Sequence, residues 1–382
     1  MKLKKRLAEI METAVERQEV PCLSLMLLEE GKEKLFLTAG KDLAEGWEPE
    51  RDTIFRLYSM SKPITAAAVA ILIERGMLDA LDPVSKYLPG FAGPKVIGPD
   101  GSLTPARREI TMMDLLSMTA GLSYPGEDPA AHAVAELFDR DTEEIRAGGG
   151  MDTMTLMNEL GKLPLAIEPG MEFRYSTCAD VLGAVVEAVS GKRFGEFLRE
   201  EIFEPLEMED TAFWVPEEKR DRFVSCAEHT EKGLVPFTSM HLCVGDYSRE
   251  PAFESGGAGL VSTLQDYARF ATMLLQGGEL DGNQVLKPGT VAWLTQPQLT
   301  CDVPWDNLGG FSYGKLMRVC VGPGRVAGIA RRGEYGWDGW LGTYFANLPD
   351  LDMTILVAMN LTNAGTAPVT RRLRNAILAE CP

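Results

Sequence analysis

The sequence predicts an α+β fold in which both ends of the chain form one antiparallel sheet and the middle forms a helical lobe. Three observations predict this arrangement. Short apolar runs typical of strands lie near the N-terminus and again after residue 310, a helical pattern with long connections fills residues 100–244, and amphipathic helical patterns flank both ends. We therefore expect one domain, residues 1–382, with a sheet subdomain (1–75 and 250–382) and a helical subdomain (76–249).

The first quarter of the chain predicts a helix, a hairpin and a second helix. Apolar residues recur at helical spacing through residues 3–15. Residues 22–28 and 34–39 are strand-like runs separated by a short polar segment with a glycine, which favours a hairpin. After a polar loop, residues 66–73 form an apolar run of good helix formers without a breaker.

Further helices are predicted in the middle of the chain, and strands near its end. The helical patterns cover residues 112–116, 130–147, 152–160, 179–189, 194–202 and 264–276. The candidate strands cover residues 311–320, 325–331, 342–347 and 352–360. A last amphipathic helix carries Val369, Leu373, Ile377 and Leu378.

Composition and charge exclude several classes of function. The chain has 382 residues, of which 45% are hydrophobic and 25% charged, an ordinary balance for a globular protein. Its formal net charge of −18 predicts no binding to nucleic acid or to an anionic membrane surface, because both repel an acidic protein. No apolar run approaches the length of a membrane span.

The cysteines and the N-terminus predict a cytoplasmic protein. The seven cysteines are odd in number and widely spaced, and they contain no C-x-x-C motif, which indicates reduced and mostly buried thiols. The N-terminus is basic, but Glu9, Glu12 and Glu16 fall where an export signal needs an apolar segment.

The strongest candidate for chemistry is the Ser-x-x-Lys pair formed by Ser59 and Lys62 at the start of the 66–73 helix. Ser59 fits the N-cap of this helix, and Pro63 still lies in its first turn. Three residues along a helix are about 300° of rotation, so both side chains point out on nearly the same face. Serine acyl-transfer enzymes that use lysine in place of histidine have this arrangement.

A four-residue motif has a high false-positive rate, and competing sites must be weighed. Ser-x-x-Lys also occurs at Ser312 and Lys315, and Ser312 lies in a Gly-x-Ser-x-Gly sequence typical of a nucleophile elbow. No histidine follows residue 241 to complete that triad, so we interpret this segment as a strand containing glycines. The three histidines are scattered, which predicts no metal site.

Two other segments supply partners for Ser59. Tyr175 follows a Glu-Pro-Gly turn and lies just before a helix, and a tyrosine can carry a proton if nearby cations such as Lys62 depress its pKa. The segment from Tyr335 to Thr343, which contains Trp337 and Trp340, joins two predicted strands, and backbone at a strand edge can offer an N–H group to an oxyanion. Each of these residues can equally be structural.

Taken together and in this order, the motifs resemble the serine β-lactamase-like superfamily, in particular class C β-lactamases and family VIII carboxylesterases, with penicillin-binding-protein-like relatives. The resemblance runs nearly end to end. It is carried by Phe55-Arg56-Leu57-Tyr58-Ser59-Met60-Ser61-Lys62-Pro63, by residues 79–89, by Leu115-Leu116-Ser117-Met118-Thr119-Ala120-Gly121-Leu122, by residues 205–211, and by Gly256-Gly257-Ala258-Gly259-Leu260-Val261-Ser262-Thr263. Met118 stands where the family usually has histidine.

The resemblance implies a β-lactamase/transpeptidase-like fold, that is, an α/β sandwich with a helical lobe, and it implies roles for particular residues. Ser59 would be the nucleophile, Lys62 and Tyr175 the general base and acid, and the backbone N–H groups of Ser59 and Trp340 the oxyanion hole. No cofactor or metal is implied.

Two departures from the family pattern concern substrate binding. Thr177 stands where the family's Tyr-x-Asn motif has asparagine. Trp337-Asp338-Gly339 replaces the Lys-Thr-Gly strand motif and comes closest to the esterase branch. Lysine to tryptophan removes a cation that would bind a β-lactam carboxylate, and Asp338 brings an anion to the same neighbourhood.

We therefore predict a cytoplasmic serine hydrolase that forms an acyl-enzyme on Ser59 and acts on small or short-chain esters, with no nucleic-acid or membrane partner. A second reading with the same residues is a D-amino-acid amidase or peptidase, or a weak β-lactamase. A third, of another class, is a catalytically inactive homologue that binds a small ligand.

Overall fold

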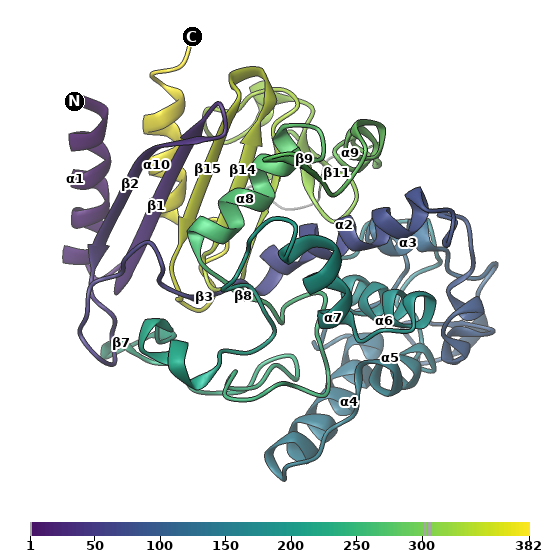
Figure 1. The fold of residues 1–382 in the computed structure, drawn as a ribbon. Helices are drawn as coiled ribbons and strands as arrows, with labels where there is room; N and C mark the ends of the chain where they lie inside the picture. The colour runs from purple at the N-terminus through teal and green to yellow at the C-terminus, as the bar shows by residue number, and fades with distance from the viewer. Residues whose placement is uncertain (1, 301–302, 304–307) are drawn as a thin grey trace.

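The structure is a computed structural model that describes residues 2–300, 303 and 308–382. Its centre is a seven-stranded antiparallel sheet with the strand order β11-β12-β13-β14-β15-β1-β2 (Figure 1). These strands are β1 (Cys22–Glu29), β2 (Lys32–Gly40), β11 (Phe311–Tyr313), β12 (Arg318–Cys320), β13 (Tyr335–Asp338), β14 (Tyr344–Leu348) and β15 (Met353–Ala358). The predicted sheet from both chain ends is confirmed.

The two ends of the chain meet where β1 pairs with β15. Leu25 lies opposite Val357 and Leu27 opposite Ile355 in this antiparallel ladder. Side chains from Cys22 to Leu28 are all buried, so both faces of β1 are covered. This double burial explains why β1 is apolar at almost every position, with Ser24 the exception, rather than alternating.

Helices cover both faces of the sheet. On one face, α1 (Lys2–Glu16) and α10 (Pro368–Leu378) lie side by side, and α8 (Leu264–Leu275) lies on the other face (Figure 1). Leu7 of α1 and Leu373 of α10 are fully buried in a cluster with the apolar side chains of β1, β14 and β15. The terminal helices predicted from periodicity are therefore held by this apolar face.

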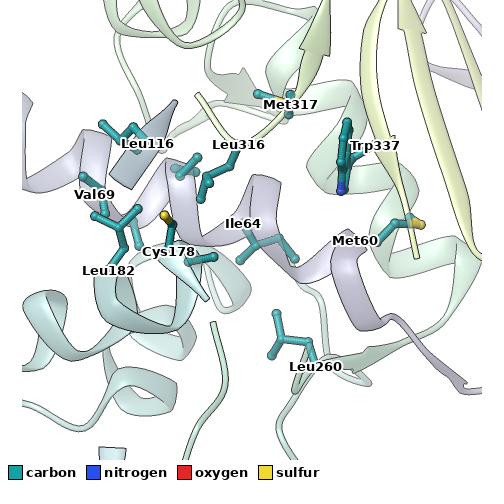
Figure 2. Packing of buried hydrophobic residues seen from close by; sticks show 14 of the residues in the cluster. Met60, Ile64, Val69, Leu116, Cys178, Leu182, Leu260, Leu316, Met317 and Trp337 are labelled. Carbon is teal, nitrogen blue, oxygen red and sulfur yellow. The ribbon is translucent and has the colours of Figure 1, made fainter. Parts of the chain in front are cut away.

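The helical lobe packs around α2 (Ser61–Glu74). Its helices are α3 (Met112–Leu116), α4 (Pro129–Arg146), α5 (Thr153–Gly161), α6 (Cys178–Ser190) and α7 (Phe194–Leu198), and α9 (Pro288–Leu294) lies near the sheet. Figure 2 shows Ile64 and Val69 on α2, with Cys178 and Leu182 of α6 on one side and Trp337 of β13 on another. Residues 61–72 are all buried, so beyond its polar first turns α2 is apolar on every side rather than amphipathic.

Short strand pairs complete the chain between these elements. They are β3 (Phe55–Arg56) with β8 (Val261–Ser262), β4 (Lys95–Ile97) with β5 (Leu103–Pro105), β6 (Ala227–Thr230) with β7 (Gly233–Pro236), and β9 (Glu279–Leu280) with β10 (Asn283–Gln284). The β3–β8 pair matters for the site, because the chain passes from β3 directly to Ser59. The division into a sheet and a helical subdomain at residues 75 and 250 stays a prediction.

The predicted strands after residue 310 need correction. Residues 325–331 form no strand; a 3₁₀ turn, Pro323–Arg325, is followed by irregular chain in which Ile329 is 40% exposed, so no buried face supports a strand there. Residues 311–320 form two paired strands instead of one. The strand that the sequence did not predict is β13, which contains Gly336; a Cβ there would lie 2.0 Å from the Phe345 carbonyl oxygen, so this close approach of strands requires glycine.

The described cysteines agree with the prediction of unpaired and mostly buried thiols. Cysteines 22, 178, 226, 243, 320 and 381 are unpaired thiols, and all but Cys381 are buried, whereas Cys301 lies outside the described residues. In the part of the chain that the structure describes, every helix is too short or too polar to cross a bilayer.

Candidate active site

Ser59 lies in a single 3₁₀ turn, Tyr58–Met60, that leads from β3 into α2. The prediction that Ser59 caps the helix is wrong: the N-cap of α2 is Met60, and it makes no side-chain cap bond. The 3₁₀ turn runs straight into the helix, so the Ser59 hydroxyl is not used by the backbone. Tyr58 has a φ of +47°. Such a positive value is uncommon for residues other than glycine, and it occurs mostly at functional or otherwise constrained sites.

Lys62 lies beside Ser59 and is completely buried. Its Nζ is 2.9 Å from the Ser59 Oγ, 3.0 Å from the Tyr124 hydroxyl and 2.8 Å from the Gly257 carbonyl oxygen. The carbonyl can only accept, whereas both hydroxyls can donate or accept. A neutral Lys62 amine can therefore donate to Gly257 and accept the Ser59 proton in the same geometry.

The pKa of Lys62 suits a proton acceptor. Burial lowers it from 10.5 to about 7, and the nearby Asp180 carboxylate partly opposes this by favouring the ammonium form. Asp180 is itself buried and accepts hydrogen bonds from Ser255 Oγ at 2.5 Å and from the Gly257 backbone N–H at 2.9 Å. A substantial fraction of Lys62 is thus neutral at neutral pH, as a general base requires.

Tyr175, predicted to lie close to Ser59, is brought there just before α6. Its hydroxyl interacts with the Ser59 side chain and accepts a hydrogen bond of 3.0 Å from the indole Nε1 of Trp337. Lys62 Nζ lies 4.8 Å from the centre of its ring. Burial raises the pKa of Tyr175 and outweighs these hydrogen bonds, so the expectation of a depressed pKa is wrong and the residue stays a neutral phenol that can donate a proton.

Two backbone N–H groups, those of Ser59 and Trp340, are candidates for an oxyanion hole. The first lies in the first turn of a 3₁₀ helix, where N–H groups have no partner within the helix. The second lies in the turn after β13, and within the described chain it donates to no backbone carbonyl. Gly339 allows these segments to approach: a Cβ there would lie 2.2 Å from the Leu57 carbonyl oxygen.

Aromatic contacts hold the Trp340 turn against the Ser59 turn. The Trp340 ring centre lies 5.2 Å from that of Tyr58 and 4.2 Å from that of His241, with which it is stacked. Its Nε1 donates a 2.8 Å hydrogen bond to Asn363 Oδ1. The Thr343 hydroxyl also donates a 2.8 Å hydrogen bond to the Leu57 carbonyl oxygen, so ring packing and this bond together position the two candidate oxyanion amides.

Thr177, Trp337 and Asp338 stand at positions where the family's motifs contact substrate, and each is buried or paired in this structure. Thr177 is fully buried and its hydroxyl donates to the Ser123 carbonyl oxygen at 3.3 Å. Asp338 forms an ion pair with Arg318, so its charge is compensated. Trp337 is only 2% exposed, so it reaches the site mainly through its hydrogen bond to Tyr175.

The competing serine, Ser312, lies on β11 and is buried. Its hydroxyl donates to the Leu299 carbonyl oxygen at 2.9 Å. Lys315 Nζ is 3.5 Å from the Gln296 carbonyl oxygen and lies over the ring of Trp293. This second Ser-x-x-Lys match is part of a strand pair, as predicted.

Tyr124 and Asp180 are two site residues that were not predicted from the sequence. Tyr124 comes two residues after the motif that ends at Leu122, and Asp180 is a charged residue in the first turn of the otherwise apolar α6. Either position could have been noticed as a polar residue next to a recognised motif or in an apolar run. Among residues 2–300, 303 and 308–382, no cluster of histidine, cysteine and carboxylate side chains has the geometry to hold a metal ion.

Comparison with known proteins assigns the chain to a family. The family model described as Beta-lactamase matches residues 7–379. The chain is 31% identical over 330 residues to Protein Rv1367c of Mycobacterium tuberculosis, covering 83% of this chain and 79% of that protein. It is 28% identical over 351 residues to Esterase EstB of Burkholderia gladioli, covering 88% and 85%. Among solved structures it is similar to EstCE1, a hydrolase with promiscuous acyltransferase activity, with a TM-score of 0.82, 25% identity and 98% coverage of both chains.

Proposed function

The chain belongs to the beta-lactamase family and is a serine hydrolase of that fold, and from this premise we propose that it is a carboxylesterase acting on small or short-chain esters through an acyl-enzyme on Ser59. The observation that carries this proposal is the contact of 2.9 Å between the Ser59 Oγ and the buried Lys62 Nζ, whose pKa is about 7. A nucleophile within hydrogen-bond reach of a neutral base is the requirement for covalent catalysis.

In the first step, Lys62 removes the Ser59 proton as Oγ attacks the ester carbonyl carbon. The carbonyl oxygen becomes an oxyanion, which the backbone N–H groups of Ser59 and Trp340 stabilise. The proton is then carried to the alkoxide of the leaving alcohol by Tyr175, a role supported by the interaction of its neutral hydroxyl with the Ser59 side chain. The products of this step are the acyl-enzyme and a free alcohol.

In the second step, the acyl-enzyme reacts with water. The same groups act in reverse: a base removes a proton from water, the oxyanion forms again in the same hole, and the proton returns to Ser59 Oγ as the carboxylic acid leaves. An alcohol in place of water would give acyl transfer, and the similar protein EstCE1 is a hydrolase with promiscuous acyltransferase activity.

The preference for esters over β-lactams rests on the missing cation. Trp337 stands where the family's lactamase branch has a lysine, and it presents a neutral indole N–H to Tyr175. Arg174, the cation adjacent to Tyr175, is paired with Asp128. A charge-assisted hydrogen bond contributes about 1.5–3 kcal/mol, so its loss lowers transition-state binding of a β-lactam carboxylate roughly ten- to a hundredfold. An uncharged ester needs no such contact.

The test compares kcat/KM for a short-chain p-nitrophenyl ester and for a chromogenic cephalosporin on the purified chain. The ester constant is expected to be higher, and equal or reversed constants would refute the preference. A fluorophosphonate probe should label the unmodified protein and Ser312→Ala but not Ser59→Ala. Labelling without ester turnover would favour the amidase or peptidase alternative, and absence of labelling would favour the inactive ligand-binding homologue.

A cytoplasmic location remains part of the proposal. The unpaired thiols support it, because disulfides are rare in a reducing compartment. Fractionation of the native host, with an antibody against the chain, would place it directly.

A further inference from the structure

A large pocket lies beside the turn that carries Ser59, between residues 236–253, the C-terminal end of α4 and the 3₁₀ turn Tyr58–Met60. Its volume is about 920 Å³. Pockets of roughly 300–1,000 Å³ bury most of the surface of a drug-sized ligand. The acyl group of an acetate or propionate would therefore fill only a small part of this space.

The lining of the pocket is apolar inside and polar at the rim. Its inner wall comprises the buried side chains of Tyr58, Phe213, Val244, Tyr247 and Phe253. Its rim includes the exposed polar or charged residues Thr238, Asp246 and Arg249. Arg56 also lines the pocket, but its guanidinium donates to the Val224 carbonyl oxygen at 2.6 Å and lies over the Phe223 ring. An apolar group would therefore gain free energy by leaving water for the inner wall.

Two lining residues connect the pocket to the candidate catalytic groups. Tyr58, in the inner wall, directly precedes the nucleophile Ser59. Phe237 packs edge-on against the ring of Trp340, with 5.6 Å between the ring centres, and the backbone N–H of Trp340 belongs to the candidate oxyanion hole. A group attached to the carbon that Ser59 attacks therefore has this pocket beside it.

The position of Tyr175 indicates which half of an ester the pocket holds. In the proposed reaction Tyr175 gives its proton to the leaving alcohol, so the alcohol lies on the Tyr175 side of Ser59. Neither Tyr175 nor Trp337, to which it is hydrogen-bonded, lines the pocket. The carbonyl oxygen occupies the oxyanion hole, so the acyl chain is the remaining substituent of the reacting carbon.

We propose that this pocket binds the acyl group of the substrate, and that the preferred ester carries an apolar acyl group larger than acetyl, a medium-length chain or a ring. This inference rests on the proposed function and specifies the acyl half of its substrate. The depth of the pocket, rather than the groups around Ser59, then sets the preference for acyl length.

The first test measures kcat/KM of the unmodified full chain for p-nitrophenyl acetate, butyrate and hexanoate. The leaving group is the same in all three esters, so contacts on the alcohol side stay constant. A fully buried methylene contributes about 0.8 kcal/mol, which is roughly fourfold in transition-state binding. With partial burial of the added methylenes, kcat/KM for the hexanoate should exceed that for the acetate at least about tenfold.

Gly245→Phe tests whether this pocket is the source of the preference. Gly245 lines the pocket, its φ lies outside the left-handed region, and a Cβ there would meet no heavy atom within 4 Å, so the backbone has room for a side chain. The added ring reduces the pocket, and the hexanoate-to-acetate ratio of kcat/KM should fall at least about tenfold. Gly289→Phe is the matched control, because its Cβ position is equally open but it lines a different cavity near the C-terminal end of α2. It should keep the wild-type ratio.

A crystal structure decides the assignment even if Gly245→Phe does not fold. A p-nitrophenyl pentylphosphonate, which matches the hexanoyl group in length, would phosphonylate Ser59 Oγ and release p-nitrophenol. Its alkyl chain should lie against Tyr58 and Phe253. An alkyl chain beside Tyr175 or in solvent would overturn the assignment.

The kinetic outcomes separate this inference from the proposed function. Hydrolysis of all three esters with no rise in kcat/KM toward the hexanoate would overturn the inference alone, and so would an unchanged ratio in Gly245→Phe or an equal fall in Gly289→Phe. Hydrolysis of none of the esters by the unmodified chain would overturn the proposed function and this inference with it.

Discussion

Replacing Asp180 with asparagine should move the acid limb of the pH–rate profile to lower pH. Lys62 is active as a base only when neutral, so activity falls as pH drops through its pKa of about 7. The Asp180 carboxylate favours the charged form and raises this pKa. Asparagine removes that attraction, so more Lys62 is neutral at any given acidic pH.

The magnitude follows from the position of Asp180. It accepts a hydrogen bond from the Gly257 N–H, and the carbonyl of the same residue accepts one from Lys62, so one residue separates the two charges. A nearby opposite charge shifts a pKa by about 1–3 units. With a shift of about one unit, the neutral fraction at pH 6 rises from roughly a tenth to about half. The variant-to-wild-type rate ratio should therefore increase about fivefold between pH 8 and pH 6.

The assay is kcat/KM for a p-nitrophenyl ester from pH 5 to pH 9. The ratio of rates is the readout, because any overall loss from the substitution cancels between the two pH values. An asparagine can still accept from Ser255 Oγ and the Gly257 N–H, so the local structure should be kept. Asp266→Asn is the matched control: it is also a buried carboxylate, whose pKa burial raises to about 6, but it bonds to Asp210 N and Thr211.

An acid limb that stays in place in Asp180→Asn, or moves to higher pH, would refute this reasoning. The first outcome would mean that a group other than Lys62 limits the rate at acidic pH. A shift of equal size in Asp266→Asn would show that any lost buried carboxylate changes the profile and would remove the specific role of Asp180.

Four other outcomes are expected. Ser59→Ala should lose several orders of magnitude in kcat while Ser312→Ala stays near wild type, because only the first serine contacts a base; similar activity in both variants would contradict the assignment. Lys62→Ala and Tyr175→Phe should each slow acylation at least about a hundredfold in stopped-flow measurements, and a normal rate for Tyr175→Phe would make the tyrosine structural. Dialysis against a strong chelator should leave the rate unchanged, and zinc-restored activity would disprove this. Burial raises the pKa of Glu254 from 4.5 to about 7, so the wild type loses stability as pH rises through this interval. The Tm of Glu254→Gln should therefore rise relative to that of the wild type between pH 5 and pH 8, and parallel Tm curves would contradict this expectation.

The local parts of the site could be predicted from the sequence because they depend on short-range geometry. Ser59 and Lys62 are three residues apart where a 3₁₀ turn runs into α2, and this short spacing brings them together, as the 2.9 Å contact shows. The N-terminal end of the sheet was predictable for a similar reason: the run from Cys22 to Leu28 is apolar except for Ser24, and such a run is stable only with both faces covered.

Other features were decided by contacts between distant segments. The 325–331 run has strand-like residues but no buried face. By contrast, β13 forms between β12 and β14 because both neighbouring strands pair with it, and Gly336 allows the close approach to Phe345. Asp338 carries a negative charge in the sequence, yet its effect on a substrate is set by Arg318, twenty residues away on β12.

For Lys62, too, the sequence determined the local geometry and contacts between distant segments determined the rest. The sequence by itself determined that a lysine lies next to the candidate nucleophile. Tertiary structure decided the pKa of Lys62, because the residues around its amine come from three separate segments. Tyr124 and Gly257 contact the amine, and Asp180 acts on it electrostatically. Desolvation and Coulomb interactions depend on distances in space, and spacing along the chain does not encode those distances beyond a turn or two of helix.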